Sequence, residues 1–92
     1  MNAPRISAVD YLPRFEKALS KLDKRIKEAV KEAIEDIQKS PVPPGRRLHK
    51  MSGYDNVWEV RATSSFRLTF ELQGSTAIFR NVGSHDHLLR NP

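Results

Sequence analysis

The spacing of apolar residues changes once along the chain. From residue 13 to residue 39, apolar side chains recur every three or four positions, which is the period of one helix face. From residue 57 to residue 82 they alternate with polar side chains, which is the period of a strand with one buried face. The chain therefore predicts helices followed by a sheet.

The first helix is expected to begin near residue 13. Pro13 suits a first helical turn, and Asp10 is a plausible cap just upstream. Phe15, Leu19 and Leu22 follow at positions i, i+4 and i+7, so they share one apolar face.

A second helix is expected after Asp23, which is a favourable cap residue. Its apolar stripe consists of Ile26, Val30, Ile34 and Ile37. Lys and Glu residues occupy the other faces, and the segment 40–45, Ser-Pro-Val-Pro-Pro-Gly, ends the helix and forms an extended linker. The two helices together predict a helical hairpin.

The second half of the chain predicts three strands, at residues 57–62, 65–72 and 76–82, with a turn at 73–75. The spacing suits an antiparallel meander whose apolar face covers the helical hairpin. Residues 5–9 are a further short candidate for an edge strand. The expected fold class is α+β, with an N-terminal helical hairpin packed on a small antiparallel β-sheet.

The composition fits one small globular domain over residues 1–92, because 38% of the residues are hydrophobic and 29% are charged. The absence of Cys excludes disulfides, Cys-ligated zinc and a thiol nucleophile. No segment has the run of about 18 apolar residues that a membrane span needs, and the N-terminus lacks the apolar run of a signal peptide. We therefore expect a cytoplasmic protein without membrane association.

The net charge of +5 and the pI of about 9.9 favour a polyanionic partner, either nucleic acid or an acidic protein. Residues 41–92 contain six Arg and one Lys against four acidic residues, and all three His. Arg binds phosphate groups and His transfers protons near neutral pH. The functional residues are therefore expected in this half.

Strand alternation places the arginines of the sheet. If the apolar positions of the first two predicted strands face the helices, Arg61 and Arg67 face the other way on strands about 5 Å apart. Arg80 is ambiguous, because its strand has apolar residues at both parities. The alternative is that these arginines are solvated charges, paired with Glu59 and Glu71.

The histidines lie at two places near the predicted sheet. His85, Asp86 and His87 follow the last strand in an expected loop, where catalytic residues are common. His-x-His without further ligands is a weak zinc site, so no metal is expected. His49 and Lys50 add positive charge near the linker. The alternative for both segments is an exposed polar turn.

Four segments, in this order, resemble the RelE/ParE toxin superfamily. They are Leu-His-Lys-Met-Ser-Gly at 48–53, Trp-Glu-Val-Arg at 58–61, Phe-Arg-Leu-Thr-Phe-Glu at 66–71 and Val-Gly-Ser-His-Asp-His-Leu-Leu at 82–89. The last is similar to the terminal Gly-x-His-x-x-Leu-aromatic element of the family. The resemblance, which spans nearly the whole chain, implies a small basic toxin held inactive by a cognate antitoxin protein, with DNA binding only through that antitoxin.

The resemblance also implies an activity. Several family members cut mRNA on the ribosome without a metal or other cofactor, whereas the ParE branch inhibits DNA gyrase. Arg67 matches the arginine that contacts the scissile phosphate, Arg61 falls where a basic or histidine residue often lies, and His85 matches the usual proton donor. Leu89 stands where many active ribonucleases have an aromatic residue, which is a departure from the pattern, and His87 has no firm counterpart.

The preferred function is a metal-independent, ribosome-dependent mRNA endoribonuclease in which Arg61 and Arg67 hold the phosphate and His85 is the acid. Glu59, His49 and His87 are all candidates for the base. The further candidates for RNA contact are Arg80, Lys50, His49 and His87. The alternatives are a ParE-like gyrase inhibitor without enzymatic activity, and a degenerate member that acts only in a complex with antitoxin and DNA.

Overall fold

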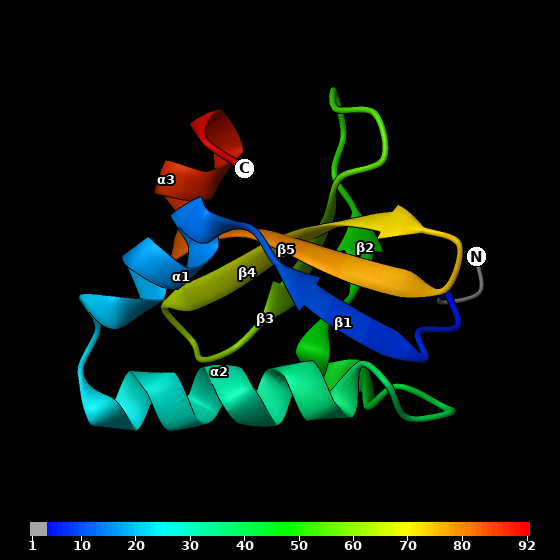
Figure 1. The fold of residues 1–92 in the computed structure, drawn as a ribbon, viewed down its shortest axis with the longest axis horizontal. Coiled ribbons are helices and arrows are strands. Elements are labelled where there is room, and N and C mark those ends of the chain that lie inside the picture. Colours follow the sequence, from blue (N-terminus) through cyan, green and yellow to red (C-terminus); the bar gives the residue numbers. More distant parts are fainter. Residues whose placement is uncertain (1–3) are drawn as a thin grey trace.

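The computed structural model describes residues 4–92, in which a sheet separates a long helix from a short C-terminal one (Figure 1). The elements in chain order are β1 (Ala8–Tyr11), α1 (Pro13–Ser20), α2 (Lys24–Asp36), the 3₁₀ turn η1 (Pro44–Arg46), β2 (His49–Lys50), β3 (Trp58–Arg61), β4 (Phe66–Gln73), β5 (Thr76–Ser84) and α3 (His85–Arg90). The five strands form one sheet in the order β1-β5-β4-β3-β2. Among residues 4–92, no helix has the length and hydropathy needed to cross a membrane.

The predicted α+β class is confirmed, with a correction to its N-terminal part. The described chain begins with a strand and not with the helical hairpin, and β1 pairs in parallel with β5, which makes the sheet mixed instead of antiparallel. The strand expected at residues 5–9 lies at Ala8–Tyr11 because the backbone there continues the ladder along β5 as far as Leu12, whose N–H donates to the carbonyl of Phe79. β3 and β4, and β4 and β5, pair antiparallel, as predicted. His49 and Lys50 form the strand β2, which pairs antiparallel with β3 and was not predicted.

The two helices begin in different ways. Asp10 is not the cap of α1, since it lies within β1; Leu12 occupies the cap position, and Pro13 supplies the first turn as predicted. Asp23 does cap α2, because its carboxylate accepts a hydrogen bond of 3.0 Å from the backbone N–H of Ile26.

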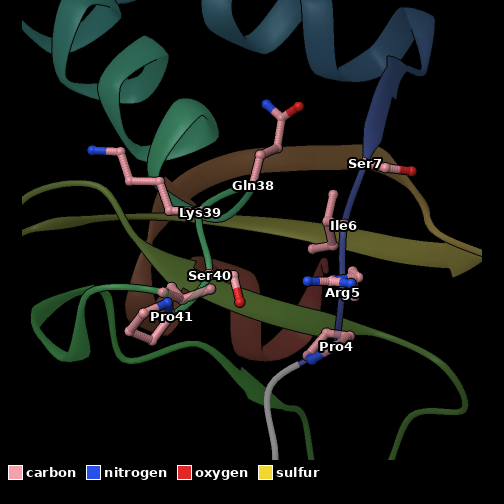
Figure 2. Close-up of a pocket in the computed structure, with 9 residues that line it drawn as sticks. Pro4, Arg5, Ile6, Ser7, Gln38, Lys39, Ser40 and Pro41 are labelled. Atoms are coloured by element: carbon pink, nitrogen blue, oxygen red, sulfur yellow. The ribbon is translucent and has the colours of Figure 1, made fainter.

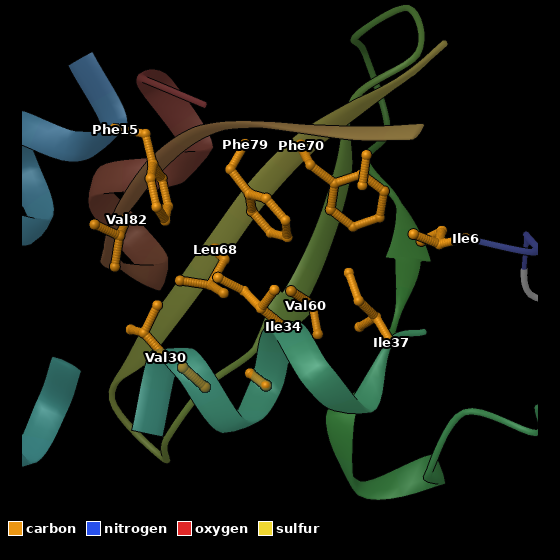
Figure 3. Close-up of a cluster of buried hydrophobic side chains, with 13 residues drawn as sticks. Ile6, Phe15, Val30, Ile34, Ile37, Val60, Leu68, Phe70, Phe79 and Val82 are labelled. Atoms are coloured by element: carbon orange, nitrogen blue, oxygen red, sulfur yellow. The ribbon is translucent and has the colours of Figure 1, made fainter. Parts of the chain in front are cut away.

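The core lies between α1, α2 and one face of the sheet, as Figure 3 shows. Its fully buried members include Phe15, Val30, Ile37, Val60, Leu68, Phe70 and Phe79. Phe79 is central, because its ring centroid lies 5.4 Å from that of Phe15 and 5.4 Å from that of Phe70. The apolar residues that the sequence placed on one face of each element thus meet in one cluster.

A β-bulge explains the ambiguous parity of β5. Thr69 pairs with Asn81, whereas the next residue of β4, Phe70, pairs with Phe79, so Arg80 is the extra residue. The bulge lets Phe79 and Val82 both reach the core although they are three positions apart. Side chains of β5 therefore alternate between the two faces of the sheet before and after Arg80, and the alternation shifts by one residue at Arg80.

The other face of the sheet holds α3. Gly83 makes room for this helix, because a Cβ atom there would lie 3.1 Å from Cδ2 of His87. Leu88 is fully buried, and the side chain of Asn81 donates a hydrogen bond of 2.7 Å to the carbonyl of Asn91. His85 and His87 therefore lie in a short helix on the sheet, which corrects the expected loop.

Candidate functional site

Arg61 and Arg67 are directly opposite each other on β3 and β4. Their neighbours Val60 and Leu68 are fully buried in the core, so the two arginines face the other side of the sheet, as alternation predicted. Both guanidinium groups donate to the carbonyl of Thr63, at 3.3 Å from Nε of Arg61 and 3.0 Å from Nη1 of Arg67. Two positive charges thus converge at the end of this strand pair.

A buried carboxylate lies beside them on the same face. Glu59 is 1% exposed, and its Oε1 atom lies 3.5 Å from Nε2 of His49, 3.6 Å from Nδ1 of His85 and 3.9 Å from Nε of Arg67. We call these four residues the Glu59 cluster. It joins β2, β3, β4 and α3 around one oxygen atom.

The sheet register explains why these residues meet. His49 is the register partner of Glu59 on the neighbouring strand, and Arg67 lies on β4 two positions from Thr69, the partner of Glu59 on that side. β5 ends at Ser84, one residue past the partner of Arg67, so the first residue of α3 lies near the cluster. The hydroxyl of Ser84 caps α3 by accepting from the backbone N–H of His87.

The cluster has an outer layer and an inner layer. The side chains of His49 and His85 are 54% and 51% exposed, whereas that of Glu59 is 2% exposed. The Oε2 atom of Glu59 is buried and has no hydrogen-bond partner among the described residues. A ligand therefore meets the imidazoles first, and the carboxylate lies behind them.

A hollow of about 240 Å³ opens in front of the cluster. It is lined by His49, Lys50, Met51, Ser52, Glu59, His85 and Leu89. Two imidazoles and an ammonium group on one wall, with Leu89 and Met51 beside them, suit a ligand that has an anionic group and an apolar part. Leu89, where the family pattern has an aromatic residue, is 48% exposed.

Hydrogen bonding sets the roles of the ring nitrogens. Nδ1 of His49 lies 2.7 Å from the carbonyl of Arg47, which can only accept, so Nδ1 carries a proton. The neutral His49 ring therefore has its lone pair on Nε2. His85 turns Nδ1 toward Glu59, which leaves its Nε2 as the nitrogen on the far side of the ring.

Other predicted site residues lie outside the cluster. Arg80 forms an ion pair of 2.9 Å with Glu71 and lies outside the Glu59 cluster. The ring of His87 lies over Gly83, and His87 lines another hollow with Asp86, Leu89, Arg90 and Asn91. Within residues 4–92, no three His, Cys, Asp or Glu side chains are grouped as a metal site.

A larger hollow of about 770 Å³ lies elsewhere, between the N-terminal segment and the residues that follow α2 (Figure 2). Arg5, Lys39 and Gln38 are among its lining residues, and none of its lining residues belongs to the hollow at the Glu59 cluster. The larger hollow is therefore distinct from the smaller hollow where the two imidazoles and the buried carboxylate lie.

Two features of the site have no clear signal in the sequence. One is the buried position of Glu59, whose Oε1 atom lies 3.6 Å from Nδ1 of His85 in α3. Tyr54, in the segment between β2 and β3, donates a hydrogen bond of 2.7 Å to the carbonyl of Leu89. This contact joins two segments that are 35 positions apart, and only the fold brings them together.

No protein-family model matches the chain, and no curated protein sequence does. Solved structures do match. YafQ from E. coli strain BL21(DE3) has a TM-score of 0.72 and 19% identity, over 87% of this chain and 94% of that chain. A chain of the RelB-RelE antitoxin-toxin complex from Methanococcus jannaschii has a TM-score of 0.65 and 27% identity, over 86% and 93%.

A YoeB/ParE toxin from Agrobacterium tumefaciens is also similar, with a TM-score of 0.71 and 15% identity, over 86% of this chain and 99% of that chain. All three matches cover nearly the whole of both chains. This protein therefore has the fold of the RelE/ParE toxin superfamily, which confirms the resemblance predicted from its sequence.

Proposed function

We propose that this protein is the toxin of a toxin–antitoxin pair and that it cleaves mRNA on the ribosome, in the cytoplasm, with its own His and Arg side chains and no metal ion. The observation that carries the proposal is the Glu59 cluster, in which two half-exposed imidazoles and a guanidinium surround one carboxylate at the edge of a hollow. The shared fold supports the toxin part of the proposal, since one matching structure is an antitoxin–toxin complex.

The proposed reaction is an attack by the 2′-hydroxyl of the RNA on the adjacent phosphate. Nε2 of His49 accepts the hydroxyl proton, the 2′-oxygen forms a bond to phosphorus, and the bond from phosphorus to the 5′-oxygen breaks. Nε2 of His85 donates a proton to that leaving oxygen. The products are a 2′,3′-cyclic phosphate and a 5′-hydroxyl, so atoms and protons balance.

The position of each base candidate favours His49. Glu59 lies behind the imidazoles, and His87 lies over Gly83 outside the cluster. His49 lines the hollow, and the Arg47 carbonyl leaves the lone pair of its neutral ring on Nε2. It is therefore the half-exposed base candidate at the hollow, and we assign the base to it.

The arginines supply fixed positive charge. Arg67 and Arg61 share a single neutral acceptor, the carbonyl of Thr63, so both keep donors for a phosphate oxygen. Such donors stabilise the charge that develops on the phosphorane. Lys50 lines the hollow and adds an RNA contact, while Arg80 and His87 are assigned to contacts outside it.

The proposed partner in the resting state is a cognate antitoxin that covers the basic surface with an apolar or acidic segment. A net charge of +5 on 92 residues favours such a segment. DNA binding is assigned to the antitoxin alone.

The test is primer extension on a translated message with wild-type protein, His85→Ala and a chelator control. Removing a positioned acid should slow cleavage by roughly 10²–10⁴-fold, while ribosome binding changes far less because the arginines remain. Arg25→Ala, which removes an exposed charge on α2, is the matched control and should cleave like wild type.

Equal cleavage by wild type and His85→Ala would remove His85 from the reaction. A wild type that leaves mRNA intact and blocks supercoiling by DNA gyrase would move the protein to the ParE branch. A wild type with neither effect that still binds antitoxin and DNA would be the degenerate form.

A further inference from the structure

We infer that Glu59 is a positioning residue that holds the two imidazoles of the site through one shared oxygen atom, beside which one imidazole gains a positive charge as the other loses one. This inference rests on the proposed ribonuclease function. It assigns to the carboxylate a role other than that of base, although Glu59 was a candidate for base from sequence.

Glu59 is the most deeply buried member of the Glu59 cluster. The side chain is 1% exposed, and its Oε2 atom is enclosed. His49 from β2, His85 from α3 and Arg67 from β4 are the charged or titratable side chains within 4.0 Å of its Oε1 atom among the described residues. Glu59 is almost fully buried although it lines the hollow, and its Oε1 atom faces these three side chains, so we assign its effect to them.

The contact with His85 selects the reactive nitrogen. A carboxylate facing Nδ1 stabilises the ring form with a proton on Nδ1, both before and after the ring gives up its Nε2 proton. The proton on Nε2 is then the one available to the leaving oxygen. A buried carboxylate that orients an imidazole through Nδ1 is a well-established arrangement in acid–base catalysis.

The contact with His49 serves the opposite step. Its Nε2 begins as a bare acceptor and becomes an N–H that faces Oε1 of Glu59 at 3.5 Å. One imidazole thus gains a positive charge as the other loses one, and both lie within 4 Å of the same oxygen. The carboxylate of Glu59 faces the imidazolium of His85 before the reaction and that of His49 after it, so the groups around the carboxylate need little rearrangement.

Arg67 completes the arrangement. It is the permanent cation near Oε1, at 3.9 Å, and it also donates to the carbonyl of Thr63. Since Arg stays protonated throughout, Glu59 retains a counter-charge when either histidine is neutral.

The test compares Glu59→Gln, which keeps the shape and removes the charge, with Glu59→Asp, which keeps the charge and shortens the side chain. Glu71→Gln is the matched control, because it removes a carboxylate that pairs with an arginine of the same sheet outside the cluster. Single-turnover cleavage on programmed ribosomes gives the maximal rate and the affinity separately, and thermal unfolding reports the fold.

We expect Glu59→Gln to lower the maximal cleavage rate by roughly 10²-fold or more, to leave ribosome affinity within a few-fold, and to keep the unfolding midpoint. Glu59→Asp should regain part of the rate, and Glu71→Gln should keep it. A rate equal to wild type in folded Glu59→Gln would overturn the inference, as would a loss of rate matched by an equal loss of affinity.

A second measurement does not depend on activity. Nitrogen-15 spectra of the histidine rings, at a pH where they are neutral, report which ring nitrogen carries the proton. We expect Nδ1–H at His85 in wild type and a shift toward Nε2–H in Glu59→Gln, with His49 still Nδ1–H because Arg47 holds it. His87, in the same helix, is the internal reference.

These spectra separate the two proposals. If wild-type protein shows the expected ring forms but does not cleave mRNA, the ribonuclease function is refuted, and the positioning role of Glu59 has no reaction to serve. Nε2–H at His85 in a wild type that does cleave would overturn the role of Glu59 alone.

Discussion

Replacement of Arg46 by Ala is expected to destabilise the fold without touching the Glu59 cluster. Arg46 lies in η1 and joins α2 to the end of β3. Its Nε donates to Oδ2 of Asp36 at 2.8 Å, and its Nη1 donates to the carbonyls of Arg61 and Ala62 at 3.2 and 3.1 Å. Nη2 lies 3.7 Å from Glu32, which is exposed and adds little.

The magnitude follows from what remains after the change. Asp36 keeps a contact of 2.7 Å with Lys39, so its charge is not left alone. The carbonyls of Arg61 and Ala62 lose a charged donor, and each hydrogen bond to a charged group contributes about 1.5–3 kcal/mol. With partial compensation by water, we expect a loss of about 3 kcal/mol, near the lower end for breaking a buried pair. The unfolding midpoint should fall by roughly 12–24 °C in a domain of this size.

The pH dependence provides a second readout. Hydrogen bonds from Lys39 and Arg46 hold the pKa of Asp36 below its ordinary value of 3.8. A lowered folded-state pKa stabilises the fold above the unfolded-state pKa, and this stability is lost as pH falls through the folded-state value. The difference between wild type and Arg46→Ala should therefore be larger at about pH 7 than at about pH 2.

Urea unfolding at both pH values measures the difference, with the exposed neighbour Arg47→Ala as control. A loss below about 1 kcal/mol, the range of surface ion pairs, would refute the structural role of Arg46. A difference that grows in acid would refute the assignment of its effect to Asp36.

Two other substitutions separate site geometry from stability. Gly83→Val pushes a side chain against the ring of His87 and should displace α3, so we expect a sharp fall in the cleavage rate and a stability loss of about 1–3 kcal/mol. Gly45→Ala is the control, because a Cβ atom there meets open space. An unchanged cleavage rate in Gly83→Val would show that this contact does not hold α3 in place. Asp23→Ala removes the cap of α2 and should lower stability by about 1 kcal/mol with cleavage unchanged. A loss of cleavage in folded Asp23→Ala would mean that α2 contributes to the site.

The sequence predicted the elements that depend on local periodicity. The stripe of α2 and the alternation of β3 and β4 appear in the structure as expected, and with them the common face of Arg61 and Arg67. These predictions succeed because a slip of one residue would turn a whole apolar face to solvent. The parallel pairing of β1 was not predicted, since a strand of four residues at the sheet edge has no such penalty to specify its partner.

The site was predicted less completely because its parts come from four separate elements. His85 and Arg67 could be proposed from their motifs, but the contact of His85 with Glu59 and the position of His87 over Gly83 depend on where α3 packs on the sheet. The parity of Arg80 could not be assigned, because a single inserted residue in β5 shifts the alternation and leaves no local pattern.

Two buried carboxylates of this chain, on opposite faces of the sheet, differ in how closely their cations approach. Asp36, on the helical side, has contacts of 2.7 and 2.8 Å to its cations, which are the distances of fully formed charge-assisted hydrogen bonds. Glu59, on the other face, has contacts of 3.5 to 3.9 Å and a buried oxygen without a partner among the described residues.

An unsatisfied buried oxygen destabilises a fold, so packing alone does not explain a carboxylate at position 59. The loose contacts are suited to an oxygen that must exchange one cationic partner for another while the imidazoles face a substrate. If this interpretation is correct, removing the charge of Asp36 lowers stability and removing that of Glu59 lowers activity, which is the pattern expected when a protein retains an unfavourable interaction for its function.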